Sequence, residues 1–185
     1  MLRAAGRGVL VGLAWGGLAR IFMRLLSTSP EFTWVGTSAI LAMSAVLWGG
    51  IGLVTGARRA QRSRWWRLAP VAGLVLFAGP GSLLVPGAVG TAVALALHGR
   101  SVVIRVLPLL LGLAVTLYPV LGPDSEGAGE VAPGAWLGLA LVVVATIWLG
   151  FGLHAWWRRW AVPGGATPTR GRRRAAPRHA AYDMG

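Results

Sequence analysis

Five apolar stretches in this chain are long enough to cross a lipid bilayer, at residues 8–26, 34–56, 68–97, 101–121 and 135–157. A helix needs about 20 mostly apolar residues to cross the hydrocarbon core. The stretches cover most of the 185 residues, so little chain remains for a separate soluble domain. With 55% hydrophobic and 12% charged residues, the chain is predicted to be an all-α polytopic transmembrane bundle.

The composition narrows the chemistry further. All 18 basic residues are arginine, and together with 28 glycines and many alanines this bias is typical of a GC-rich bacterial genome. The chain has no cysteine, which excludes disulfides, thiolate metal sites and cysteine nucleophiles. The first stretch resembles a signal peptide in having Arg3 and Arg7 before it, but Arg20 and Arg24 follow it and no cleavage site precedes Pro30. We therefore expect an uncleaved first span.

Arginines collect beside some ends of these stretches. Residues 57–67 and the C-terminal region hold most of them: Arg58, Arg59, Arg62, Arg64 and Arg67, then Arg158, Arg159, Arg170, Arg172, Arg173, Arg174 and Arg178. Because cytoplasmic loops retain positive charge, these regions and the N-terminus are predicted to be cytoplasmic in a cell membrane. Asp124, Glu126 and Glu130 then fall in an outer loop.

This orientation requires one stretch to return to the side from which it came. Stretch 68–97 is too long for one straight span and is interrupted by Gly79, Pro80 and Gly81. Proline removes a backbone donor, and glycine permits a tight turn. A helical hairpin is predicted, with arms at 64–78 and 82–98 that either just span or re-enter, so the bundle has four full spans and six helices. The alternative is one long kinked helix that places the tail outside.

The domain organisation follows from this map. Residues 1–160 form the transmembrane helical domain, and residues 161–185 are rich in Gly, Pro, Ala and Arg without apolar periodicity. We expect this basic tail to be disordered and cytoplasmic. Trp15, Trp48 and Trp148 lie near the middle of their spans and are expected to pack in the core.

Small residues recur at four-residue spacing, a pattern that lets two helices approach closely in lipid. The positions are Gly8, Gly12 and Gly16, then Gly52 and Gly56, then Gly134 and Gly138. These glycines are predicted to pack against helices of the same chain. The alternative is a dimerisation or partner-docking face.

Arg20 and Arg24 lie toward the outer end of the first span, and Ser27, Thr28 and Glu31 follow them. An arginine in hydrocarbon costs a few kcal/mol or more unless it is paired or hydrated. One interpretation is an ion pair with Glu31 that folds the outer segment over the bundle. The other is an outward-facing site in which the guanidiniums and hydroxyls bind a phosphate, as of a lipid, or a carboxylate.

The break at Gly79, Pro80, Gly81 and Ser82 offers a second possible anion site. Transporters direct the N-terminus of a broken helix at an anion, and here Ser82 and the second arm would supply the donors. A hairpin turn at the outer interface explains the same residues without a ligand, and this simpler interpretation is preferred.

The sequence gives little support for a bound cofactor. His98 and His154 both fall near cytoplasmic helix ends and could approach each other, but two interfacial histidines alone are weak evidence for a haem or a metal. We expect neither cofactor nor metal. The basic clusters are predicted to contact anionic lipids at the cytoplasmic face, and no nucleic acid is expected.

These features lead to a ranked set of functions. The predicted spans contain no Asp or Glu, which disfavours ion-coupled transport. The leading hypothesis is a non-enzymatic accessory subunit or scaffold, with a protein partner or a second copy as its counterpart. The alternative is a carrier or binder of an anionic lipid or small anion through Arg20 and Arg24. A haem protein or a membrane hydrolase comes third.

Overall fold

The computed structural model describes residues 1–27, 33–77, 79, 81–122 and 133–160, and these residues are helical nearly throughout. The tail predicted to be disordered lies outside the described residues. The α-helices are α1 (Leu2–Leu26), α2 (Trp34–Arg59), α3 (Ala69–Phe77), α4 (Val85–Ala96), α5 (Val102–Leu121) and α6 (Pro133–Trp157). Two short 3-10 helices, η1 (Arg64–Leu68) and η2 (Ser82–Leu84), precede α3 and α4.

Four of these helices, α1, α2, α5 and α6, are long and apolar enough to cross a membrane. These four helices correspond to the predicted stretches 8–26, 34–56, 101–121 and 135–157. α1 starts earlier than expected, at Leu2, because alanine, leucine and arginine all favour helix across Arg3 and Arg7. α2 begins at a cap, where the Thr33 hydroxyl accepts a hydrogen bond from the Gly36 amide at 3.2 Å.

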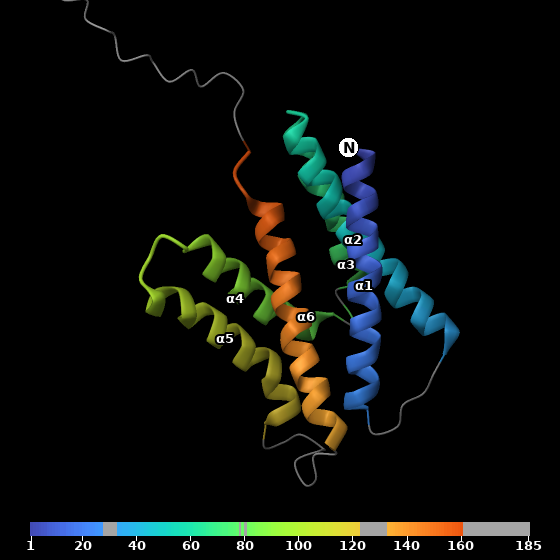
Figure 1. Ribbon diagram of the computed structural model, residues 1–185, viewed down its shortest axis with the longest axis vertical. Coiled ribbons are helices and arrows are strands. Elements are labelled where there is room, and N and C mark those ends of the chain that lie inside the picture. The colour runs from blue at the N-terminus through green and yellow to red at the C-terminus, as the bar shows by residue number, and fades with distance from the viewer. Residues whose placement is uncertain (28–32, 78, 80, 123–132, 161–185) are drawn as a thin grey trace, which may run out of the picture.

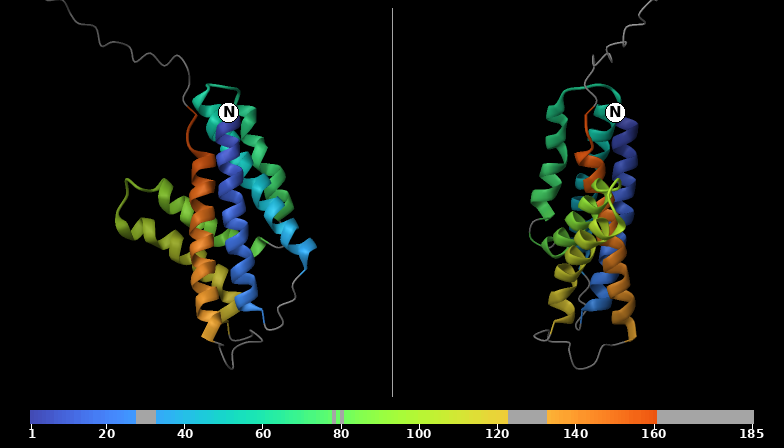
Figure 2. Two further views of the ribbon diagram at one scale, coloured as in Figure 1. Left: turned by 45° about the vertical axis from the view of Figure 1, so that its right-hand side comes forward. Right: turned by 90° about the vertical axis from the view of Figure 1, so that its left-hand side faces the viewer.

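Helices α1, α2 and α6 form an upright group, and α3 packs against α2 (Figure 1). The α4–α5 pair is inclined and projects sideways from this group (Figure 2). α4 contacts both α5 and α6, so α6 joins the pair to the upright helices. The bundle therefore has two parts that meet along α6.

Glycines bring α1 and α2 into close contact. A Cβ added at Gly12 would lie 2.9 Å from the Cα of Ala45, and one at Gly56 would lie 3.1 Å from the Cα of Met1. Gly8, Gly16 and Gly52 likewise face α2 or α1 atoms, and Gly138 lies beside Leu25 and Leu26 of α1. Gly134 is looser, 3.6 Å from Leu25 Cδ2. All seven spaced glycines thus face contacts within the chain.

Trp15 is the centre of the core, with none of its side chain exposed. Its indole Nε1 donates to the carbonyl oxygen of Ala145 on α6 at 2.9 Å. Its ring also meets Phe77, the last residue of α3, edge to face at 5.5 Å between centroids. Trp48 and Trp148 contact each other in the same way at 6.2 Å. The expected core role of these three tryptophans is therefore visible in their contacts.

The interrupted stretch forms two helices at the expected break, with a different course from the expected hairpin. The chain bends by 118° between Arg64–Phe77 and Ser82–Ala96, and α3 packs on α2 whereas α4 packs on α5 and α6. Phe77 contacts Trp15 in the middle of α1. The turn thus lies beside the middle of α1, and its level in a membrane stays a prediction.

The contacts of α4 show its direction. Gly87 faces Thr146 and Thr91 faces Gly150, so α4 runs parallel to the second half of α6. Together, the segments on either side of the break are apolar and long enough for one broken span, and their bend equally suits a re-entrant loop.

The two ends of the bundle differ in charge. Met1 lies beside Gly56, and Arg58 beside Ala155, so the N-terminus, the end of α2 and the end of α6 gather together. We call this the arginine-rich end, and Figure 1 shows Met1 and the C-terminal end of α6 on this side. The C-terminal end of α1 and the N-terminal end of α6 lie at the opposite end (Figure 2).

Candidate functional site

The arginine-rich end is held together by hydrogen bonds to the last turn of α6. Arg58 Nη2 donates to the carbonyl oxygens of Ala155 at 2.9 Å and Trp156 at 3.2 Å. Arg67 Nη2 donates to the carbonyl of Arg158 at 3.3 Å, and Trp156 Nε1 donates to the Arg67 carbonyl at 2.8 Å. The final carbonyls of a helix lack partners within it and carry partial negative charge, so arginine suits this position.

Trp160 completes this arrangement, which we call the latch (Arg58, Arg67, Trp156 and Trp160). Its Nε1 donates to the Arg62 carbonyl at 3.1 Å. The guanidinium carbons of Arg58 and Arg67 lie 5.7 and 5.6 Å from its ring centroid. Cation–π attraction of this kind adds to the hydrogen bonds. The latch fixes the end of α6 next to a cavity.

This cavity, the α4–α6 pocket, has a volume of about 730 Å³. Its floor is apolar, with Val89, Ala92 and Val93 on α4 and Leu153 on α6. Because α4 leans away from α6 toward its C-terminal end, small side chains on the facing surface leave the space open. The volume is in the range of small-molecule sites.

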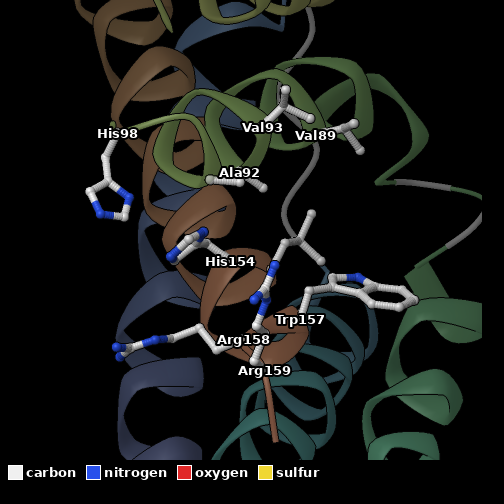
Figure 3. Close-up of a pocket in the computed structure, with 10 residues that line it drawn as sticks. Val89, Ala92, Val93, His98, His154, Trp157, Arg158 and Arg159 are labelled. Carbon is white, nitrogen blue, oxygen red and sulfur yellow. The ribbon is translucent and has the colours of Figure 1, made fainter. Parts of the chain in front are cut away.

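The rim of the α4–α6 pocket is basic. His98 follows α4, His154 and Trp157 end α6, and Arg158 and Arg159 come next. Figure 3 shows these side chains gathered between the end of α4 and the last turn of α6. An apolar floor beside two positive charges suits a ligand with an anionic head and an apolar body.

The histidines that the sequence placed near helix ends do meet at one pocket. His98 Nδ1 lies 3.3 Å from the Leu95 carbonyl oxygen, and this contact leaves Nε2 toward the surroundings. Among the described residues no group of three or more His, Cys, Asp or Glu side chains could hold a metal ion.

The outer arginine cluster is described in part. Arg20 Nε donates to Thr37 Oγ1 at 3.1 Å and thereby ties α1 to α2. Arg24 occupies the last turn of α1, and Ser27 ends the helix. Thr28 and Glu31, the other members of the predicted site, lie outside the described residues.

The donors at the helix break are satisfied within the chain. Ser82 Oγ donates to the Gly79 carbonyl at 3.0 Å, and the Gly87 amide donates to the Thr116 hydroxyl at 2.9 Å. Thr116 is fully buried on α5. Gly79 and Gly81 flank the turn, while Pro80 lies outside the described residues. The interpretation without a ligand therefore accounts for these donors.

Sequence reasoning treated Arg158 and Arg159 only as a topological signal. What it missed is that α4 returns alongside α6, which brings the apolar face of one helix to the basic end of the other. The available signal was the pair His98 and His154, whose possible approach was recognised.

Comparison of the chain with family models, curated proteins and solved structures gave no match. The class of protein is therefore defined by the fold alone. Four long apolar helices and an interrupted pair are the helices of a membrane-embedded, all-helical protein.

Proposed function

We propose that this chain is a multi-pass membrane protein that binds an anionic phospholipid in the α4–α6 pocket. The observation that carries the proposal is the combination of an apolar floor with a rim of Arg158, Arg159, His98 and His154. In this arrangement the lipid phosphate accepts hydrogen bonds from the arginines, and an acyl chain lies along Val89 and Val93.

The location suits such a ligand. Trp157 ends α6 beside the pocket, and tryptophan is enriched at the headgroup level of membranes. Basic residues near the cytoplasmic surface attract anionic lipid by about 1 kcal/mol per charge. The arginine-rich end is accordingly assigned to the cytoplasmic side of a cell membrane, with both termini there.

Native mass spectrometry of the full-length, delipidated protein tests this proposal. Phosphatidylglycerol and phosphatidylcholine with identical acyl chains are offered in equal amounts. We expect preferential retention of phosphatidylglycerol, and loss of this preference in the Arg158→Gln/Arg159→Gln variant. The Arg3→Gln/Arg7→Gln variant removes the same charge from exposed positions on α1 and serves as the matched control. Equal retention by both variants contradicts the proposal.

A second candidate is the accessory subunit that the sequence favoured. The spaced glycines face the chain's own helices, so a partner or second copy needs another surface. α5 offers one, because Leu107, Leu110 and Leu111 are exposed on a helix that packs mainly against α4. A stoichiometric protein in gently isolated native preparations supports this candidate, and its absence with retained lipid favours the first.

The Arg20→Ala variant distinguishes a structural role of the outer arginine cluster from anion binding by that cluster. If Arg20 serves structure through Thr37, Arg20→Ala lowers folding yield. If the cluster with Arg24, Ser27, Thr28 and Glu31 binds a lipid phosphate, Arg20→Ala gives a folded bundle that no longer retains the ligand. Unchanged yield and lipid content contradict both roles.

A further inference from the structure

A second pocket lies on the opposite side of α4 from the site described above. It has a volume of about 300 Å³ and is lined by residues of α4, α5 and α6. Leu95, Leu109, Ile147 and Phe151 supply apolar walls. Arg105, in the first turn of α5, is its one charged lining residue. We call this space the Arg105 pocket.

The Arg105 side chain has an unmet hydrogen-bonding requirement. Its Nε is buried and has no hydrogen-bond partner in the part of the chain that the structure describes. A guanidinium stays charged and presents its donors in a rigid fork. The only other polar side chain of the lining, Thr91, already donates to the Gly87 carbonyl at 2.8 Å. Apart from Arg105 and Thr91, the lining of the Arg105 pocket is apolar.

The depth of the Arg105 pocket makes an unpaired guanidinium there costly in free energy. Phe151 comes six residues before the end of α6 at Trp157, which is about 9 Å along the helix axis. A charged arginine below the interface is normally paired or hydrated. None of the described residues is acidic, because all five acids of the chain lie at positions 31, 124, 126, 130 and 183. The described helices therefore supply no counter-charge.

We infer that the Arg105 pocket binds the anionic head of a single-chain amphiphile, such as a fatty acid or a lysophospholipid. Two parallel hydrogen bonds from the guanidinium meet the carboxylate or phosphate oxygens. The chain of the ligand lies between α4 and α5 against Leu95 and Leu109. A volume less than half that of the α4–α6 pocket suits one chain better than two.

Photo-crosslinking of the full-length protein tests this inference. The probes are hexadecanoate, lysophosphatidylglycerol and uncharged hexadecanol, each carrying a diazirine on its chain. We expect the anionic probes to label peptides of α4 and α5, and hexadecanol to label them weakly. The relative labelling by the two anionic probes identifies which head is preferred.

Substitution of Arg105 gives the decisive comparison. Arg105→Gln is expected to reduce anionic labelling of these peptides at least about tenfold, as for loss of a charge-assisted hydrogen bond. Arg100→Gln, which removes an exposed charge in the turn before α5, should leave labelling unchanged. Equal labelling of Arg105→Gln and wild type overturns the inference.

A second variant keeps the test valid if Arg105→Gln folds poorly. Ala94 also lines the pocket, so Ala94→Phe fills the space and keeps the charge. It should reduce labelling to a similar extent, and unchanged labelling contradicts the inference. The Arg158→Gln/Arg159→Gln variant should retain this labelling, so failure of the phospholipid proposal is recognised separately.

Discussion

Arg58, next to the last residue of α2, donates from Nη2 to the carbonyl oxygen of Ala155 in the last turn of α6 at 2.9 Å. This bond joins two helix ends that are 97 residues apart in the chain. It closes the bundle at the arginine-rich end and positions Arg158 and Arg159 at the rim of the α4–α6 pocket.

Removal of this bond should loosen that end of the bundle. Arg58→Ala leaves the α6 carbonyls without their donor and removes a cation from the Trp160 ring. We expect a loss of about 2 kcal/mol in unfolding free energy, typical of hydrogen bonds to charged groups. Denaturant unfolding followed by tryptophan fluorescence measures this loss. Arg59→Ala, one residue further and exposed, should have little effect; similar losses in both variants contradict the latch.

The α1–α2 contact predicts opposite effects for two glycines of one helix. Gly12→Ala forces a methyl group against Ser44 and Ala45 and should destabilise the protein by about 1–3 kcal/mol. Gly17→Ala meets no atom within 4 Å, and alanine favours helix over glycine. Its stability should stay equal or rise. Thermal unfolding in one detergent compares the two, and equal shifts in both variants would mean that the contact is not tight.

A re-entrant course predicts a pattern of accessibility. The chain has no cysteine, so single cysteines can be introduced without removing any. Cysteines at Ser63 and Ser101 should react with an impermeant maleimide from the cytoplasmic side, and one at Ser125 from the outside. A cysteine at Gly79, where added atoms meet nothing within 4 Å, should react from neither side. Rapid labelling of Gly79→Cys from outside would contradict the re-entrant course and support a hairpin that spans the membrane.

The buried bond between Thr116 and Gly87 anchors the start of α4. Thr116→Val keeps the shape of the side chain but leaves the Gly87 amide without an acceptor, which costs about 1–3 kcal/mol. Thr55→Val is the control, because the Thr55 hydroxyl bonds only to Ile51 in its own helix. Unfolding free energies of the two variants decide whether the α4 anchor contributes as expected. Equal values would show that it does not.

The sequence predicted which segments form helices and where the break falls. It did not predict how deep in the bundle the break lies. Apolar length located the four spans within a few residues, and Gly79 to Gly81 located the break. The depth of the break depends on Phe77 reaching Trp15, which is a contact between helices that no local pattern specifies. The same limit applies to the α4–α6 pocket, because Val89 and Arg158 are joined only by packing.

Arg105 illustrates a different limit. In the sequence it belongs to a basic segment with His98 and Arg100, and such a segment is typical of a cytoplasmic loop. In the structure Arg105 lines a small pocket between three helices, and its Nε is buried without a hydrogen-bond partner among the described residues. An arginine near the end of a span can thus belong to a cytoplasmic loop or line a site between helices. Only the packing of its side chain distinguishes these two cases.

The position of α6 has a consequence for biogenesis. This helix contacts α1 through Ala145, α2 through Ala155 and α4 through Thr146 and Gly150, and it comes last in chain order among the described helices. Until α6 enters the membrane, α4 lacks one of the two long helices against which it packs, and Arg58 of the latch lacks its carbonyl acceptors. Ribosome-bound chains that stop before Pro133 should therefore be more open to proteases than chains that include α6.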